Sequence, residues 1–184
     1  MSCPAPSFRL LAISGSLRAK SINTAVLVAA QSLAPADMQM TLYRGLGDLP
    51  HFNPDLDGES PPAPVAAFRQ AIAAADALLI CTPEYAHGVP GVLKNALDWL
   101  VSFEGFINKP VAIINARPGA EYALASLRET LSVMNARLLD MAGVTLPLTN
   151  NTLDAPRLLQ MVAVRDLLVF SLQETTAALR AGTP

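Results

Sequence analysis

Apolar runs of strand length alternate along the chain with longer segments in which apolar residues recur at helical spacing. The runs that predict strands are 8–13, 38–43, 76–81, 110–115 and 143–147. The segments that predict helices are 22–33, 64–75, 92–103, 121–137 and 154–179. The chain therefore predicts five strand–helix units in succession, with no internal repeat and no linker between domains.

This alternation is typical of a parallel sheet that helices cover on both faces. We predict a flavodoxin-like, doubly wound α/β fold, a three-layer sandwich around a five-stranded parallel sheet with the strand order 2-1-3-4-5. Residues 1–184 are expected to form one such domain. Because strands one and three are neighbours in this order, the loops that follow Ile13 and Cys81 should meet at the carboxyl edge of the sheet, where these folds bind ligands.

The first of these loops has the composition of an anion site. Ser16, Ser21 and Asn23 supply neutral donors, and Arg18 and Lys20 supply positive charge. The loop also opens a helix, whose first N–H groups have no intrahelical acceptor and attract anions. We therefore predict a phosphate site, although Ser21 or Asn23 would also be explained as a simple helix cap. The segment matches neither the Walker A pattern nor the glycine-rich dinucleotide fingerprint.

The second loop is rigid and uncharged along most of its length. Pro83 ends the preceding strand, Pro90 suits the start of a helix, and Gly88 permits close approach of a flat ligand. Tyr85 adds an aromatic side chain. A ligand with a phosphate at one end and a flat apolar ring at the other would join the two loops, and FMN has that shape. A mononucleotide would also fit, but no acidic residue stands where it would read a ribose.

Composition narrows the choice of partners. The chain has 184 residues, a net charge of −2 and no basic stripe, which argues against nucleic acid. It contains no apolar stretch of membrane-spanning length, and its start does not resemble a secretory leader. We expect a cytoplasmic protein with reduced thiols at Cys3 and Cys81, the latter a small core residue. The hydrophobic content of 52% predicts a buried subunit interface, in a homodimer or homotetramer.

Two further segments are expected to play structural parts. The long connection 46–64 is rich in Pro, Asp and Gly, and His51 and Phe52 are expected to hold it down rather than close over a site. Apolar residues form a narrow stripe along the predicted helix 121–137. They are Leu124, Leu127, Leu131, Met134 and Leu138. This stripe is predicted to pack on the sheet, with a subunit seam as the alternative.

Three groups of residues together resemble the NADPH-dependent FMN reductase family, which includes quinone, chromate and azo-dye reductases on the flavodoxin-like fold. They are Gly15-Ser16-Leu17-Arg18 with Ser21 and Asn23, then Pro83-Glu84-Tyr85, then Pro90-Gly91, Leu93-Lys94-Asn95 and Asp98-Trp99. The resemblance spans most of the chain, and its motifs are specific in combination rather than singly.

The resemblance implies FMN as cofactor and NADPH, or NADH, as co-substrate. The residues that it implies around the phosphate are Ser16, Leu17, Arg18, Ser21, Ile22 and Asn23. The residues that it implies around the flavin ring are Pro83, Glu84, Tyr85, Ala86 and His87. Within that set, Glu84 is expected to act through its main chain and Tyr85 as a ring contact. Lys94, Asn95 and Asp98 are expected to fix the helix start and subunit contacts, and Trp99 to pack.

The chain also departs from the family. The family commonly has Asn after the Tyr and Ser two places further on, where this chain has Ala86 and Gly88 with His87 between them. The third flavin loop, often rich in Ser and Gly, is 115–119 here and contains Arg117, which is expected to face the flavin, an acceptor or solvent. These departures bear on the choice of substrate more than on the cofactor.

The expected activity is therefore hydride transfer from NADPH or NADH to FMN, and from FMN to a quinone, a metal oxyanion or free flavin. Such chemistry belongs to the cofactor and needs no catalytic side chain and no metal. Two alternatives stay open. One is an electron carrier that holds FMN and docks protein partners, and the other is a sensor or interaction module that has lost the flavin.

Overall fold

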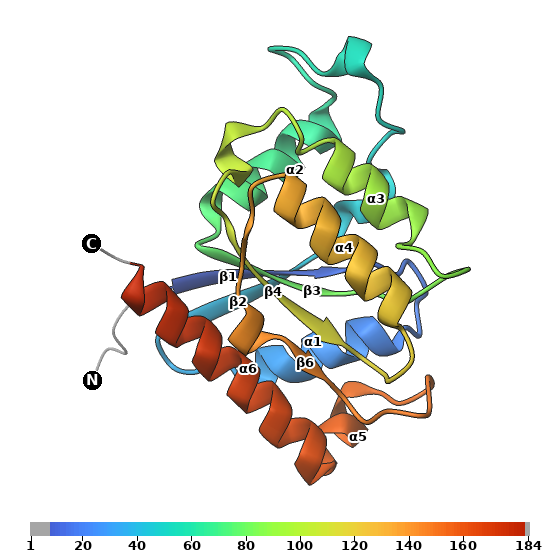
Figure 1. Cartoon of the computed structure of the whole chain (residues 1–184), viewed down its shortest axis with the longest axis vertical. Helices are drawn as coiled ribbons and strands as arrows, with labels where there is room; N and C mark the ends of the chain where they lie inside the picture. Colours follow the sequence, from blue (N-terminus) through green and yellow to red (C-terminus); the bar gives the residue numbers. More distant parts are fainter. Residues whose placement is uncertain (1–7, 183–184) are drawn as a thin grey trace.

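The computed structural model describes residues 8–182 and contains one parallel sheet (Figure 1). Its strands are β1 (Phe8–Ser14), β2 (Met38–Tyr43), β3 (Ala77–Cys81), β4 (Pro110–Asn115), β5 (Arg137–Leu138) and β6 (Val144–Thr145). The order is β2-β1-β3-β4-β5, and the sixth strand, β6, also pairs with β4. The predicted parallel order 2-1-3-4-5 is confirmed.

Helices cover both faces of the sheet, as predicted. They are α1 (Ile22–Ser32), α2 (Ala63–Ala74), α3 (Gly91–Asp98), α4 (Glu121–Val133), α5 (Ala155–Gln160) and α6 (Val162–Ala181). In Figure 1, α2, α3 and α4 lie above the sheet, and α1 and α6 lie below it. Alternate residues of each strand serve the two layers: Leu79 belongs to the core under α1 and α6, whereas Leu78 and Ile80 belong to the core under α2, α3 and α4. This is the three-layer flavodoxin-like sandwich.

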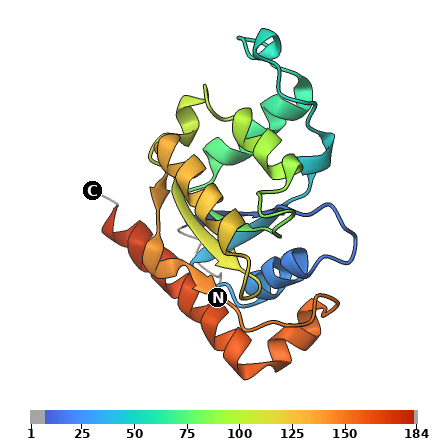
Figure 2. The ribbon, with the colours of Figure 1, turned by 45° about the vertical axis from the view of Figure 1, so that its right-hand side comes forward.

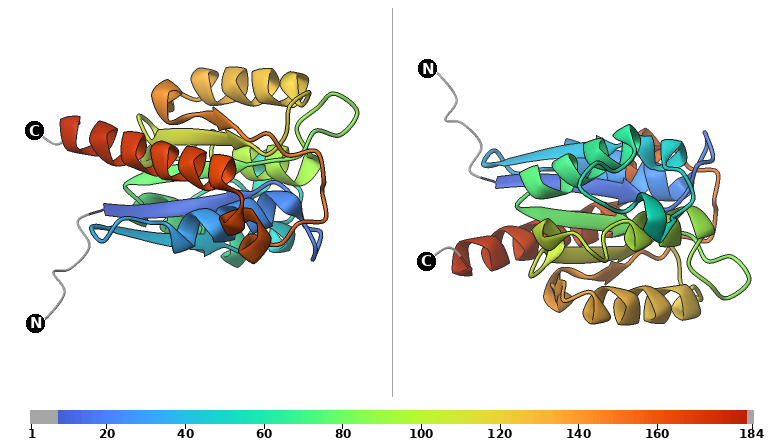
Figure 3. Two further views of the ribbon diagram at one scale, coloured as in Figure 1. Left: turned by 90° about the horizontal axis from the view of Figure 1, so that it is seen from below. Right: turned by 90° about the horizontal axis from the view of Figure 1, so that it is seen from above.

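The register of the central strands brings their carboxyl ends to one edge. Ser14 of β1 pairs with Cys81 of β3, and Cys81 pairs with Ile114 of β4. The segments that follow β1, β3 and β4 therefore leave the sheet at the same end, on the right in both views of Figure 3. These are the loops expected to bind the ligand.

Helix α3 ends at Asp98, five residues before the predicted end at Phe103. The reason is a contact from outside the helix. Arg69 of α2 donates from Nε and Nη2 to the carbonyl oxygen of Trp99, at 3.0 and 2.7 Å. Because the Trp99 carbonyl oxygen accepts from Arg69 instead of from a later N–H of the same helix, the helix does not continue past this point. Trp99 itself is fully buried, in agreement with its predicted packing role.

The fifth strand was predicted at 143–147 but is split into two short pieces. Helix α4 ends at Val133 rather than at Arg137, because Asn135 adopts a left-handed conformation with φ 58°. The chain then forms β5 beside the start of β4, leaves it through the turn η4 (Asp140–Ala142), and returns as β6 beside the end of β4. Only β6 overlaps the predicted strand.

The last predicted helix is also divided. Asp154 caps α5 by accepting a hydrogen bond from the Arg157 N–H at 3.1 Å, with Pro156 in the first turn, as the sequence indicated. The helix breaks at Met161, whose backbone is extended (φ −83°, ψ 105°), and α6 starts at the next residue.

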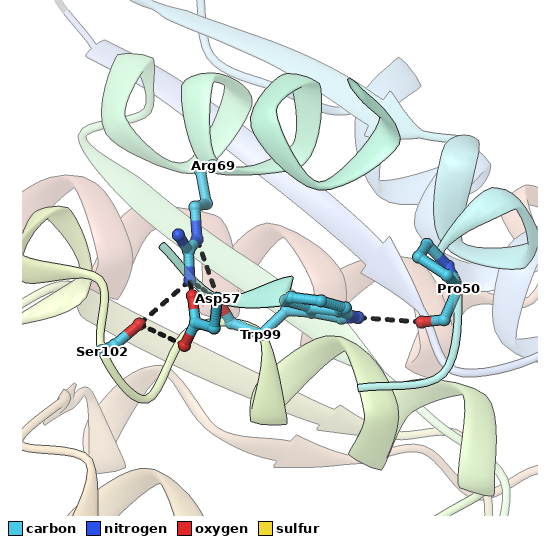
Figure 4. Close-up of polar contacts among 5 residues, drawn as sticks. All are labelled: Pro50, Asp57, Arg69, Trp99 and Ser102. Carbon is cyan, nitrogen blue, oxygen red and sulfur yellow. Dashed lines mark hydrogen bonds and ion pairs between the residues drawn. The ribbon is translucent and has the colours of Figure 1, made fainter. Parts of the chain in front are cut away.

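The connection between β2 and α2 is anchored at several points. It contains the short turns η1 (Gly45–Asp48) and η2 (Pro54–Leu56), and the part with η2 projects from the body in Figures 1 and 2. The Trp99 indole donates to the Pro50 carbonyl at 2.8 Å, while Asp57 accepts from Arg69 at 2.6 Å (Figure 4). The Phe52 ring meets that of Trp99 edge-on at 5.0 Å. Phe52 therefore holds the segment down as expected, whereas His51 is exposed.

The apolar stripe on α4 packs on the sheet, which was the preferred prediction. Leu127 and Leu131 are fully buried in the core under α2, α3 and α4, and the other stripe residues pack against the same core. Within 8–182, no helix combines the length and hydropathy needed to cross a membrane.

Candidate functional site

A cavity of about 310 Å³ opens at the carboxyl edge of the sheet. Loops that are distant in sequence contribute its walls. They supply Ser16, Arg18, Ser21, Ile22, Asn23, Thr82, Pro83, Glu84, Tyr85, Asn115, Ala116, Arg117, Gly119, Ala120 and Asn151. All of the predicted site residues line this cavity except Leu17, Ala86 and His87. The two loops singled out in the sequence therefore do share one site.

The first two loops are in direct contact at Gly15. Its N–H donates to the carbonyl oxygen of Cys81 at 2.9 Å, which extends the pairing of β1 and β3 by one residue. A Cβ at this position would lie 2.7 Å from the Cβ of Thr82, closer than real atoms approach. Only glycine lets the loops come this close, and Thr82, the residue that a Cβ would strike, lines the cavity.

The amino end of α1 faces the cavity with unused donors. The Ser21 hydroxyl accepts from the Thr24 N–H at 3.4 Å, so Ser21 is the helix cap, one of the alternatives left open. The N–H groups of Ile22 and Asn23 bond to no acceptor among the described residues, as expected for a first turn. Such an end suits an anion.

Asn23 and Cys81 meet behind this helix end. The Asn23 side-chain oxygen accepts from the Cys81 thiol at 3.3 Å, so the amide nitrogen of Asn23 is the part left for a ligand. Burial raises the pKa of the Cys81 thiol, and the residue stays protonated. Cys81 is thus a buried core residue, as predicted. Cys3 lies outside the described residues.

The charge of the cavity favours an anionic ligand. Arg18 and Arg117 line it, and neither side chain makes an ion pair with a carboxylate among the described residues. Glu84 is the sole carboxylate in the described lining, and that group is already hydrogen-bonded. Ser16 adds a hydroxyl, which accepts from the Arg18 N–H at 3.3 Å and so shapes the loop.

The structure gives the Glu84 side chain a part of its own, and the expected contact of its main chain with the flavin stays a prediction. Its Oε2 accepts a hydrogen bond at 2.8 Å from the N–H of Ala123, in the first turn of α4. The N-cap residue of that helix is Ala120, which has no capping side chain. Glu84 therefore caps a helix that belongs to the third loop, and it joins two walls of the cavity.

The turn after Glu84 explains why Ala86 and His87 lie outside the cavity. Tyr85 and Gly88 exchange backbone hydrogen bonds at 3.1 and 2.9 Å, which closes a tight hairpin. Its central residues, Ala86 and His87, have φ of 48° and 60°. The His87 ring stacks on that of Tyr122 in α4, with centroids 4.1 Å apart. His87 thus ties the turn to α4.

The sequence placed Asn115 in the third flavin loop without giving it a role, and it did not single out Asn151. Asn115 is a polar residue at the end of an apolar strand, and its Oδ1 accepts from the Arg117 N–H at 3.3 Å. Asn151 lies on the loop that follows β6. The strand order placed both loops at the carboxyl edge, so a search of that edge for polar residues would have found them.

The sequence pattern of the NADPH-dependent FMN reductase family matches residues 8–174 of the chain. The chain belongs to this family. It is accordingly an NAD(P)H-dependent oxidoreductase that uses FMN.

Individual reductases resemble it over different lengths. An NAD(P)H-dependent FMN reductase of Pseudomonas aeruginosa is 38% identical over 170 residues, covering 90% of this chain and 91% of that protein. A 2-hydroxy-1,4-benzoquinone reductase of Burkholderia is 43% identical over 117 residues, covering 62% of this chain and 63% of that protein. The solved structure of a flavoenzyme NAD(P)H:(acceptor) oxidoreductase of Paracoccus denitrificans is 25% identical in sequence and superposes with a TM-score of 0.69. The match covers 92% of this chain and 98% of that protein.

The residues present in this reductase fit FMN. The volume lies within the range of roughly 300–1,000 Å³ that is typical of small-molecule sites. The lining combines the amino end of α1 and Arg18, which suit a phosphate, with Pro83 and Tyr85, which suit a flat ring. The first turn of α1 contains no acidic residue, so no negative side chain beside its N–H groups would repel the phosphate.

Proposed function

We propose that the reductase holds FMN across this cavity, accepts NADPH or NADH, and delivers the electrons to a small-molecule acceptor, foremost a quinone. The observation that carries the proposal is the shared lining: Ser16 and Arg18 of one loop and Tyr85 of the other border the same cavity. Relatives named as quinone reductases support that class of acceptor. A metal oxyanion or free flavin would use the same open site.

The phosphate end of FMN is assigned to the loop between β1 and α1. The N–H groups of Ile22 and Asn23, the Asn23 amide and the hydroxyls of Ser16 and Ser21 would surround the phosphate oxygens. Arg18 would balance the phosphate charge. Leu17 is 61% exposed and borders no part of this cavity, so we assign it no contact with the phosphate.

The ring end is assigned to Pro83, Glu84 and Tyr85, with Arg117, which borders the same cavity. When bound, FMN supplies the redox chemistry, taking a hydride from NAD(P)H and passing the electrons to the acceptor. The residues of the cavity wall would bind and orient the ring, and the cavity opening would admit the substrates. No side chain in the cavity is required as a nucleophile or a general base.

We further propose that the chain is a single-domain, cytoplasmic homodimer or homotetramer. Large apolar side chains on the α3–β4 connection and on α4 support a subunit interface, since Val101, Tyr122 and Val133 are 67%, 61% and 73% exposed. The free buried thiol of Cys81 is in keeping with a reducing compartment. Light scattering of the purified protein measures the oligomeric state directly.

The deciding experiment is an anaerobic titration of the FMN-loaded protein with NADPH and with NADH, followed by a panel of quinones. We expect the visible flavin absorbance to bleach and then to return when a quinone is added. A protein that binds FMN but is bleached by neither nucleotide would be a carrier rather than a reductase. A protein that acquires no flavin bands after soaking with FMN would instead support the flavin-less module.

Arg18→Ala tests the phosphate assignment separately. A lost charge-assisted contact is worth about 1.5–3 kcal/mol, so FMN should bind roughly ten- to a hundredfold more weakly. Arg137→Ala is the matched control, because Arg137 is also exposed and lies on β5 opposite the start of β4, at the other edge of the sheet. Unchanged FMN affinity in Arg18→Ala would remove Arg18 from the site.

A further inference from the structure

A second, smaller hollow lies beside the loop between β1 and α1. Its volume is about 190 Å³, and Ser16 and Arg18 border both this hollow and the FMN cavity. Its other walls include Leu17, Tyr43 and Arg44, of which the last two come from the end of β2 and the residue after it. We call it the Arg44 groove. Because it shares two residues with the cavity, one extended ligand can reach both.

The charges of the groove are unbalanced in the protein alone. Neither Arg18 nor Arg44 makes an ion pair in the part of the chain that the structure describes, whereas Arg69, Arg128 and Arg180 each pair with an aspartate. Two unpaired guanidinium groups at one hollow are notable in a chain whose net charge is −2. Such a pair favours an anion.

One acidic residue, Asp48, lies close enough to act on Tyr43 of the groove. Asp48 lies on η1, is exposed, and makes no ion pair with Arg44. Burial, and after it the Asp48 charge, raises the pKa of the Tyr43 phenol, so Tyr43 is a neutral donor at physiological pH. Once Arg18 serves the FMN phosphate, the groove therefore still offers the Arg44 guanidinium and a hydroxyl, and Asp48 does not neutralise Arg44 by contact.

The FMN phosphate does not account for Arg44, which lines only the groove. The pyridine nucleotide is an anion that the reaction brings to this edge whichever acceptor is used. NADPH differs from NADH only in a 2′-phosphate on its adenosine, and an arginine is the usual partner of that group. Leu17, 61% exposed at the same groove, provides apolar surface for the adenine ring beside it.

We propose that the Arg44 groove receives the 2′-phosphate of NADPH, and that Arg44 makes the enzyme prefer NADPH to NADH. This inference rests on the proposed function, because it assumes that a pyridine nucleotide is the reductant. It adds a subsite outside the FMN cavity and a specificity-determining residue, neither of which the FMN assignment requires.

The test compares Arg44→Ala, Arg44→Lys and the control Arg137→Ala. Calorimetric titration of the FMN-loaded proteins uses two fragments, 2′,5′-ADP and 5′-AMP, which differ by the 2′-phosphate. Wild type should bind 2′,5′-ADP at least tenfold more tightly. Arg44→Ala should lose about tenfold for 2′,5′-ADP and nothing for 5′-AMP or FMN, and Arg44→Lys should retain part of the preference. In Arg44→Ala, the steady-state kcat/KM should also fall about tenfold for NADPH and stay constant for NADH.

The outcomes separate this proposal from the proposed function. Equal binding of the two fragments by wild type, an Arg44→Ala variant that still discriminates between them, or an equal loss in Arg137→Ala would overturn the groove assignment even while NADPH bleaches the flavin. If neither nucleotide reduces the flavin, the proposed function fails, and the fragment titrations still report on the groove by themselves.

Discussion

Replacing Glu84 tests whether one carboxylate holds two walls of the cavity together. Its Oε2 accepts from the Ala123 N–H at 2.8 Å, across 39 residues of sequence. Because the helix α4 has no capping side chain at its own N-cap, Ala120, this contact is the substitute. Glu84→Ala should therefore loosen both the start of α4 and the turn that carries Tyr85.

The size of the effect follows from the contact. A hydrogen bond to a charged group contributes about 1.5–3 kcal/mol, and a carboxylate at a helix amino end contributes about 0.3–1 kcal/mol. Since Glu84 is half-buried rather than fully buried, we expect Glu84→Ala to lower the free energy of unfolding by about 2 kcal/mol. For a chain of this size that corresponds to a fall in Tm of roughly 4–8 °C.

Two further variants separate the hydrogen bond from the charge. Glu84→Gln keeps an acceptor for the Ala123 N–H and should lose only about 1 kcal/mol. Glu121→Gln is the matched control, because Glu121 lies in the same first turn of α4 but makes no hydrogen bond to the helix end. Glu121→Gln should lower the free energy of unfolding by no more than about 0.3–1 kcal/mol, which is the contribution of a negative charge at a helix amino end.

The assay is urea denaturation of the flavin-free proteins, so that FMN binding does not add to the measured stability. Amide exchange at Ala123 should quicken in Glu84→Ala alone, and FMN should bind less tightly to that variant than to Glu121→Gln. If Glu84→Ala and Glu121→Gln lose the same free energy and protect Ala123 equally, the cap is not what joins the walls, and the reasoning is refuted.

Three other substitutions test a close approach at Gly15, the backbone conformation of Ala86 and the charge of Asp57. Gly15→Ala should lower the free energy of unfolding by about 1–3 kcal/mol and weaken FMN binding, because the new Cβ would stand 2.7 Å from a carbon of the facing loop; denaturation and FMN titration measure both. Ala86→Asn should raise the free energy of unfolding by up to about 1 kcal/mol, since φ is 48° there and asparagine tolerates that conformation; a lower urea midpoint would contradict this. The Ser102 hydroxyl, and after it the Arg69 guanidinium, hold the pKa of Asp57 below its usual value. That contribution to stability is complete above the ordinary aspartate pKa of about 3.9 and is lost as the pH falls below it, so Asp57→Asn should cost about 1 kcal/mol near neutrality and progressively less in acid.

The sequence predicted most of the fold because the main elements carry their own signal. The apolar runs of β1, β3 and β4 are buried on both faces, as strands in the middle of a parallel sheet must be. Alternation with helices then leaves few topologies, and the switch between β1 and β3 follows from the predicted order. The cavity could be located for the same reason, since it lies where these strands end.

The errors occurred where distant residues decide the local structure. Nothing within 92–103 indicates that α3 ends at Asp98, because the carbonyl of Trp99 is taken by Arg69, 30 residues away. The split of the fifth strand likewise depends on pairing of β5 and β6 with opposite ends of β4. The hydrophobic periodicity of a segment carries no information about contacts with distant residues, so it could not indicate either of these.

The same limit applies to individual site residues. Position along a loop does not show which way a side chain points: Ala86 and His87 stand in a left-handed turn and do not line the cavity, and their contact with the ring stays a prediction. Leu17, predicted to lie at the phosphate, lines the Arg44 groove rather than the cavity, and its contact with the phosphate is likewise untested. Whether Asn95 makes subunit contacts stays a prediction.

The residues that carry the family likeness divide into two sets with separate tasks. Pro83, Glu84 and Tyr85 border the cavity. Asn95 and Trp99 instead hold the connection after β2: the Asn95 side chain donates to the Pro50 carbonyl and accepts from the Phe52 N–H at 2.9 and 2.7 Å. Since Asn95 and Trp99 line no part of the cavity, they would persist in a relative that had lost its flavin. Retention of the first set beside an open cavity is therefore the stronger argument that this chain is a working reductase.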